Sequence, residues 1–174
     1  MSFTLLIEND MNLYVDDLLL EEDRTPVTDA ELLVHLGELP AIPQQITAAS
    51  NATPIVVTSA AHGLANGSQV LVSQVRGNDA ANGLWTVANV TTNTFELSGS
   101  EGSGDYFAGG VWYRAVDGAV SIELDYVAGS RATYRGTLPR ENNIVAGRRY
   151  VAVIDCVNYG VKFELSGVAQ VRSR

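Results

Sequence analysis

Hydrophobic residues recur at every second position in the last third of the chain, which is the period of a β-strand. In residues 119–127 the apolar side chains fall on one face, and in residues 147–157 both faces carry them. The positions that share a face are Val120, Ile122, Leu124 and Tyr126 in the first segment, and Tyr150, Ala152, Ile154 and Cys156 in the second. This pattern predicts antiparallel strands with one face turned to a core.

The first 44 residues carry a less regular pattern. Residues 3–10 predict a short strand. Residues 12–22 fit either a strand with a turn at Asp16-Asp17 or a short helix. The apolar residues of 29–38 fit the period of a strand and that of a helix equally well. Asp29 could cap a helix, whereas Pro26 before the segment and Gly37 near its end favour a strand. We therefore expect strands here too.

A connector with two prolines, residues 39–45, leads into a segment of different texture. Residues 46–113 are rich in Thr, Ser, Asn, Val and Gly and carry almost no charge. They divide into short β-branched runs separated by turns that contain Gly or Asn. Regularly spaced short strands of this kind predict a small sandwich or barrel.

Neither flank of this middle segment has enough strands to close a core by itself. The economical arrangement joins residues 1–44 and 115–174 into one discontinuous sandwich, with residues 45–114 inserted as a second domain. Insertions are tolerated at loop tips whose ends lie close together. The sequence thus predicts an all-β protein made of a sandwich and an inserted small β-barrel.

The charge of the 174-residue chain, −9 in total, is uneven. Residues 1–44 hold ten acids and one base, whereas residues 115–174 hold six acids and eight bases. An acidic chain without a basic stripe is a poor binder of nucleic acid. The N-terminus lacks the basic start of a signal peptide, and no apolar run approaches the roughly 20 residues of a membrane span. We expect synthesis in the cytoplasm and no membrane partner.

The residues that could carry chemistry are few. Cys156 is the single cysteine, so an intrachain disulfide and a cysteine-based zinc site are excluded. It lies in a strand-like run and reads as a buried hydrophobe, since neither His35 nor His62 is spaced to activate it. His62 lies between two β-branched runs, where an imidazole can bond backbone groups and close a turn. We expect no catalytic residue, cofactor or metal.

Two other stretches invite a binding interpretation. The glycines of residues 102–110 (GSGDYFAGG) could cradle a phosphate, but the strand, Lys-Ser/Thr pair and helix of a phosphate loop are missing, which favours a flexible loop. The acids Asp16, Asp17, Glu21, Glu22 and Asp23 could bind Ca²⁺, but the run lacks the glycine of a calcium loop. A solvated loop is favoured, and a cation at Asp16 and Asp17 stays open.

The middle segment resembles a small β-barrel that recurs in virion proteins of tailed bacteriophages and is similar to the first-catalytic-cysteine-half-type domain of ubiquitin-activating enzymes. The resemblance is carried in order by TSAAHGL (58–64), NGSQVLVSQVRG (66–77), ANGLWTV (81–87), TFELSGS (94–100) and GSGDYFAGG (102–110). It implies a fold and no catalysis.

The flanks resemble a second module found in phage proteins, an immunoglobulin-like sandwich. Residues 12–36 look like its opening strands, and residues 120–139 and 146–157 look like its second half. In the uninterrupted module these strands would be consecutive. The resemblance implies an immunoglobulin-like sandwich that is interrupted by the barrel.

These resemblances imply a non-enzymatic, structural accessory protein of a phage particle, located in the virion as capsid decoration, connector or tail component. The sandwich would dock on other virion proteins or on copies of itself, and the barrel would project outward. The alternative is a receptor- or glycan-binding module at the virion surface, in contact with the host, with Trp112, Tyr113 and the 99–110 loop as its binding surface; an enzyme comes last. Trp85 is expected in the barrel core. The candidate partner-binding residues are Arg135, Arg148 and Arg149 on the sandwich, and Trp112 and Tyr113 on the barrel.

Overall fold

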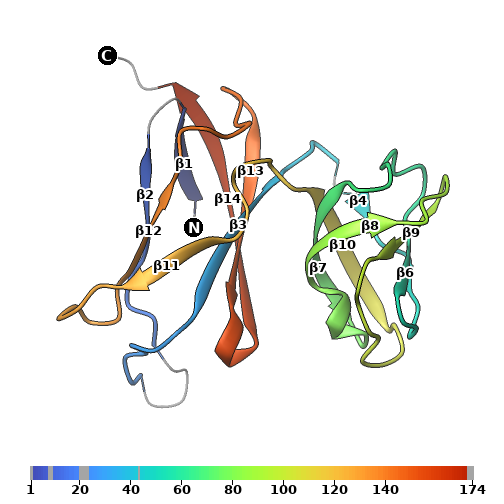
Figure 1. Ribbon diagram of the computed structural model, residues 1–174, viewed down its shortest axis with the longest axis horizontal. Helices are drawn as coiled ribbons and strands as arrows, with labels where there is room; N and C mark the ends of the chain where they lie inside the picture. The colour runs from blue at the N-terminus through green and yellow to red at the C-terminus, as the bar shows by residue number, and fades with distance from the viewer. Residues whose placement is uncertain (1, 8–9, 20–23, 43, 172–174) are drawn as a thin grey trace. The chain divides into compact units, whose positions relative to one another are not determined.

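The computed structural model describes residues 2–7, 10–19, 24–42 and 44–171, with the backbone alone at residues 2–7 and 165–171. The protein is all-β, as the sequence predicts, and its contacts divide it into two units. Residues 1–36 and 116–174 form an immunoglobulin-like sandwich, and residues 37–115 form a small β-barrel inserted between them. Figure 1 shows the blue N-terminal and the orange-to-red C-terminal strands in one unit and the cyan-to-yellow middle of the chain in the other.

The sandwich is built from seven strands in the order β1-β14-β13-β3-β11-β12-β2. Their bounds are β1 Ser2–Ile7, β2 Met11–Val15, β3 Leu32–Glu38, β11 Ile122–Tyr126, β12 Tyr134–Leu138, β13 Arg149–Cys156 and β14 Val161–Val171. A short 3-10 turn, η2 Val157–Tyr159, joins β13 to β14. Residues 12–15 and 32–38 are strands, so the strand interpretation of the N-terminal region is confirmed and the helix alternatives are wrong.

β1 and β2 form the two ends of the strand order of the sandwich. β1 pairs in parallel with β14 at one end of the strand order, and β2 pairs antiparallel with β12 at the other end. β1 and β2 are consecutive in the chain, yet they stand at opposite ends of the strand order. A sheet that curls back on itself into two facing layers brings its two end strands together, and this is how a sandwich encloses its core.

The core of the sandwich follows the alternation read from the sequence. Ile122 and Leu124 are buried on β11, and β13 contributes Tyr150, Ala152, Ile154 and Cys156 to the same cluster. From β3 come Leu32, Val34 and Leu36. Tyr134 lies at the centre of this unit with no exposed surface.

The barrel has its own strand order, β4-β10-β7-β8-β9-β6-β5. The bounds are β4 Gln44–Gln45, β5 Ala48–Ala49, β6 Ile55–Thr58, β7 Gln69–Arg76, β8 Gly83–Ala88, β9 Thr94–Leu97 and β10 Ala108–Arg114, with a 3-10 turn η1 Asp79–Ala81. β4 and β5 stand at opposite ends of the order, although only two residues separate them. The Ile46 amide donates to Gly110 O (2.9 Å) and the Thr47 amide to Thr58 O (2.9 Å), so one short segment bonds to both edges and closes the barrel.

The boundaries of the units differ slightly from the expected ones at 44/45 and 114/115. The contacts divide the chain at 36/37 and 115/116. The first boundary shifts because Gly37 forms an isolated bridge with Ala115 and β4 pairs with β10, which ties residues 37–45 to the barrel. On the sandwich side, the Leu36 amide donates to Ala119 O (2.8 Å) and the Val116 amide to Leu36 O (2.9 Å). The chain therefore leaves and re-enters the sandwich at adjacent positions.

Candidate interaction surfaces

His62 has a structural role in the barrel. The Leu64 amide donates to its Nδ1 (3.1 Å), which leaves the proton on Nε2, 3.3 Å from Thr94 O. The ring meets Phe95 edge-on at 5.1 Å between centroids and is only 6% exposed. Both ring nitrogens are thus occupied by backbone groups, and the turn role predicted from the sequence is confirmed.

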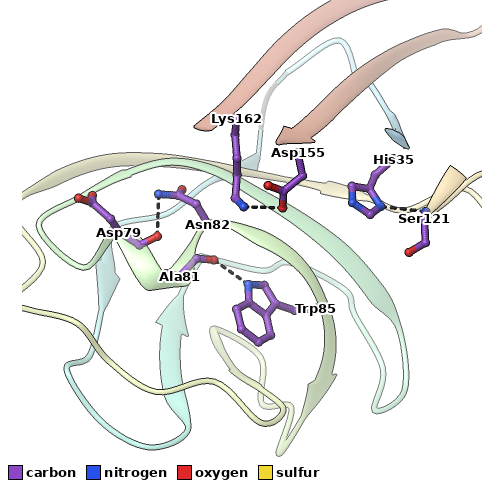
Figure 2. A network of polar contacts seen from close by, with 8 residues as sticks. All are labelled: His35, Asp79, Ala81, Asn82, Trp85, Ser121, Asp155 and Lys162. Carbon is purple, nitrogen blue, oxygen red and sulfur yellow. Dashed lines mark hydrogen bonds and ion pairs between the residues drawn. The ribbon is translucent and has the colours of Figure 1, made fainter. Parts of the chain in front are cut away.

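Cys156 and His35 are likewise held inside the sandwich. Cys156 is 3% exposed, and burial raises the pKa of its thiol. His35 accepts a hydrogen bond at Nδ1 from the Ser121 amide (3.0 Å), and burial lowers the pKa of the imidazole. The Asp155 carboxylate opposes this shift, while Lys162 adds to it. Figure 2 shows the His35–Ser121 bond and the Asp155–Lys162 ion pair, 2.6 Å between Nζ and Oδ2.

Asparagine side chains hold the loops of the barrel, a role that the sequence analysis missed. Asn82 donates to Val75 O (2.9 Å) and to Asp79 O (3.1 Å), and Figure 2 shows the latter bond. Asn78 is fully buried and donates to Ser50 O (2.8 Å). Asparagine is common in any turn, so only the tertiary contacts reveal which copies are structural.

Both tryptophans pack in the interior of the barrel. Trp85 packs against the core cluster, as expected, and donates from Nε1 to Ala81 O (2.8 Å, Figure 2). Trp112 is 3% exposed and donates to Ser59 Oγ (2.9 Å), and its neighbour Tyr113 is 4% exposed. The expectation that Trp112 and Tyr113 form a binding surface is wrong for this structure, because neither ring is open to stack on a ligand or partner.

The exposed aromatic residue of the barrel is Phe107, with 80% of its surface open. Its backbone is firmly placed: the Phe107 amide donates to Arg76 O (2.8 Å). Gly77 packs so closely that a Cβ there would overlap Asp105 O. Tyr106 bonds through its hydroxyl to Gly109 O (2.9 Å). Neighbouring side chains of an extended segment point to opposite faces. The adjacent pair Tyr106-Phe107 could therefore have indicated from the sequence that one of the two rings is exposed.

Arg135 lies on the outward face of the sandwich, as expected. It is exposed on β12, in register with Asp125 of β11 on one side and Tyr14 of β2 on the other. Tyr14 is 55% exposed. We call Tyr14 and Arg135 the outer face pair. Arg148, just before β13, and Arg149, its first residue, are also exposed, so all three arginines lie at the surface of this unit.

A second exposed surface runs along β14. Tyr159, Val161 and Phe163 are 42%, 44% and 42% exposed, and we call them the β14 edge patch. They border an apolar hollow of about 220 Å³ that is also lined by Leu18, Leu19, Val27 and Cys156. Sequence reasoning missed this patch, because alternation places Val161 and Phe163 on the core face.

A wider groove of about 430 Å³ lies between the start of β3 and β11. It is lined by apolar side chains and by Glu31, Glu123 and Asp125. Of the acids considered for a cation, Asp16 and Asp17 are exposed, and Asp17 lies 4.0 Å from Arg131 Nε. Glu21, Glu22 and Asp23 lie outside the described residues. Among the described residues, no group of three or more His, Cys, Asp or Glu side chains is placed to hold a metal ion.

No family model matches this chain, and the search of curated proteins found no match. In the described part of the chain, no helix has the length and apolar character needed to cross a membrane.

Proposed function

We propose that this chain is a non-enzymatic structural accessory protein of a tailed-phage particle, acting as capsid decoration, connector or tail component. The sandwich docks on other virion proteins and the barrel is the projecting module. In this proposal the chain is made in the host cytoplasm and resides in the virion, with copies of itself among its partners and with no cofactor.

The observation that supports this most is the division of the chain into two separately packed units, one inserted in the other. Each has a separate apolar cluster, and in each the two ends of the strand order are formed by strands that are consecutive in the chain. The two histidines bond to backbone amides of this scaffold, and the cysteine is buried within it. Such a build supplies surfaces at fixed positions, which suits assembly into a lattice.

The outer face pair is the docking surface that we favour. Tyrosine and arginine are enriched among the residues that dominate binding energy at interfaces. Tyr14 and Arg135 stand in register on neighbouring strands, so their positions are set by the sheet. Many weak contacts of this kind in a symmetric particle give high avidity.

Incorporation into particles tests the proposal. Particles assembled with the wild-type chain should retain it at a fixed stoichiometry through density-gradient purification. Tyr14→Ala combined with Arg135→Glu should lower the occupancy at least about tenfold, as expected for loss of two interface hot spots. Thr137→Ala, an exposed residue on the same strand, is the matched control and should leave occupancy unchanged. A wild-type chain absent from purified particles contradicts the proposal.

A second candidate function, binding of a host receptor or glycan by the barrel, is favoured by Phe107. An exposed aromatic ring on a firmly placed backbone is suited to stack on a sugar or to anchor a protein partner. The purified chain should then bind host cells, and Phe107→Ala should abolish that binding while the outer face variants keep it. Equal cell binding by wild type and Phe107→Ala contradicts this alternative.

A further inference from the structure

The β14 edge patch is firmly placed, although its side chains are exposed. The η2 turn before it is tied to residues 29–31 by four hydrogen bonds. Tyr159 donates to Asp29 Oδ1 (2.8 Å), Asn158 donates to Asp29 O (2.8 Å) and accepts from the Glu31 amide (3.0 Å), and the Val157 amide donates to Glu31 O (2.9 Å). An apolar surface held in this way loses little conformational freedom when it binds.

The strand beside the patch extends beyond its neighbour on one side. β13 pairs with residues 161–168 of β14, whereas the parallel register of β1 begins at Ser166. Residues 161–165 therefore run past the reach of β1. A strand edge of this kind is a template for pairing with another strand.

The β14 edge patch is exposed although Val161 and Phe163 lie on the core-facing side of β14. Phe163 is in register with Ile154, and Val161 with Cys156; both partners belong to the buried core. Val161 and Phe163 thus lie on the core-facing side of β14 but at a place where the apolar interior is open, as the hollow there shows. Apolar surface exposed together at a sheet edge favours a protein partner.

The sequence of this edge is complementary to itself. Residues 161–165 read VKFEL, and an antiparallel pair of two such strands centred on Phe163 places each Lys162 opposite the Glu164 of the other copy. The two Phe163 residues face each other at the centre. Cross-strand pairs of opposite charge and of aromatic rings are the pairs that stabilise antiparallel sheets.

From this geometry we infer that the partner of the β14 edge patch is a second copy of the same chain, joined through antiparallel pairing of residues 161–165 about a two-fold axis at Phe163. This inference builds on the proposed function, in which copies of the chain are partners. A two-fold interface uses the same surface on both subunits, which is what a self-complementary strand provides.

The charges also fix the register. Lys162 already bonds to Asp155 of β13, so its ammonium is held on the face opposite the patch, where the second copy's Glu164 arrives. A shift of one residue would turn one strand's apolar side chains to the other's charged face. The pair therefore has one favourable alignment.

Charge reversal in the full-length chain tests the inference by sedimentation over a range of concentrations. The wild-type chain should form a dimer. Lys162→Glu and Glu164→Lys should each weaken self-association at least about tenfold, because each variant brings like charges together. Equal mixtures of the two variants should form heterodimers, because lysines then meet glutamates in both pairs. Thr137→Ala is the control and should dimerise like the wild type.

Three results would overturn the inference: a wild-type chain that stays monomeric, a dimer that tolerates Phe163→Asp, or two single variants that fail to associate when mixed. Thermal unfolding of each variant, measured alongside, confirms that it is folded; Glu164→Lys leaves the Asp155–Lys162 ion pair intact. The test is also separate from that of the proposed function. Loss of particle docking in the outer face variants, with dimerisation retained, would leave this inference standing, and a monomer that still docks would remove only this inference.

Discussion

Tyr134 connects β12 to the segment before β3, and its hydroxyl is the clearest single target for a stability measurement. The ring is fully buried, and the hydroxyl both donates to Val27 O (3.0 Å) and accepts from the Ala30 amide (2.9 Å). Tyr134→Phe keeps the ring and removes both bonds. The change leaves a buried carbonyl and a buried amide without their partner, at a cost of about 1–3 kcal/mol each. We expect the sandwich to lose about 3 kcal/mol.

The two units can be followed separately, because both tryptophans of the chain, Trp85 and Trp112, lie in the barrel. Tryptophan fluorescence therefore reports unfolding of the barrel, and far-UV circular dichroism reports both units. In a domain of the size of the sandwich, a loss of 1 kcal/mol lowers Tm by roughly 4–8 °C. Tyr134→Phe should lower the Tm of the sandwich transition by at least about 10 °C and leave the fluorescence transition in place.

Tyr126→Phe is the matched control. The Tyr126 hydroxyl donates to Ser130 O (3.0 Å), but the side chain is only half buried, so water can replace the lost bond. The expected loss is below about 1 kcal/mol. If Tyr134→Phe costs no more than Tyr126→Phe, the hydroxyl of Tyr134 does not hold the segment before β3 and the reasoning is refuted.

Three further predictions concern single residues, two in the barrel and one in the sandwich. Ser59→Ala removes the acceptor of the buried Trp112 Nε1 and should lower barrel stability by about 1–3 kcal/mol in urea unfolding followed by fluorescence; an unchanged midpoint would contradict it. Gly77→Ala should destabilise the barrel by more than about 3 kcal/mol, since its φ is +89° and the added Cβ would meet Asp105 O; a folded barrel with wild-type Tm would show that the loops can separate. Because burial lowers the pKa of His35, its contribution to sandwich stability is complete above pH 6.5 and falls as the pH drops below that value, where the unfolded chain takes up the proton first. His35→Gln should flatten this part of the curve of unfolding free energy against pH. An unaltered slope would show that other titratable groups cause this pH dependence.

The sequence was most informative where a pattern is local. Alternation along β11 and β13 predicted which side chains enter the sandwich core, because side chains of a strand point to opposite faces in turn. The change of texture around residue 45 predicted an inserted unit. The role of His62 followed from its place between two β-branched runs and from the absence of any spaced companion.

The candidate surfaces were harder to predict, because exposure depends on what covers a strand. Trp112 and Tyr113 point to opposite faces of β10, so the pattern alone would leave one of them outside, yet both are buried. Conversely, Phe163 lies on the core side of β14 and is 42% exposed. The 99–110 loop was a candidate surface, but Phe107 could not be singled out within it, because the shape of this glycine-rich loop depends on contacts with Arg76 and Gly77.

By itself, the sequence determined the all-β class, the inserted middle unit and the core face of β11 and β13, since these depend on composition, periodicity and turn chemistry over a few residues. The tertiary structure decided how each unit closes: β1 and β2, consecutive in the chain, stand at opposite ends of one strand order, and β4 and β5 do the same in the barrel. It also decided which apolar residues remain at the surface. How a unit closes and which side chains stay exposed depend on contacts between segments that are far apart in the chain. Local periodicity cannot predict those contacts.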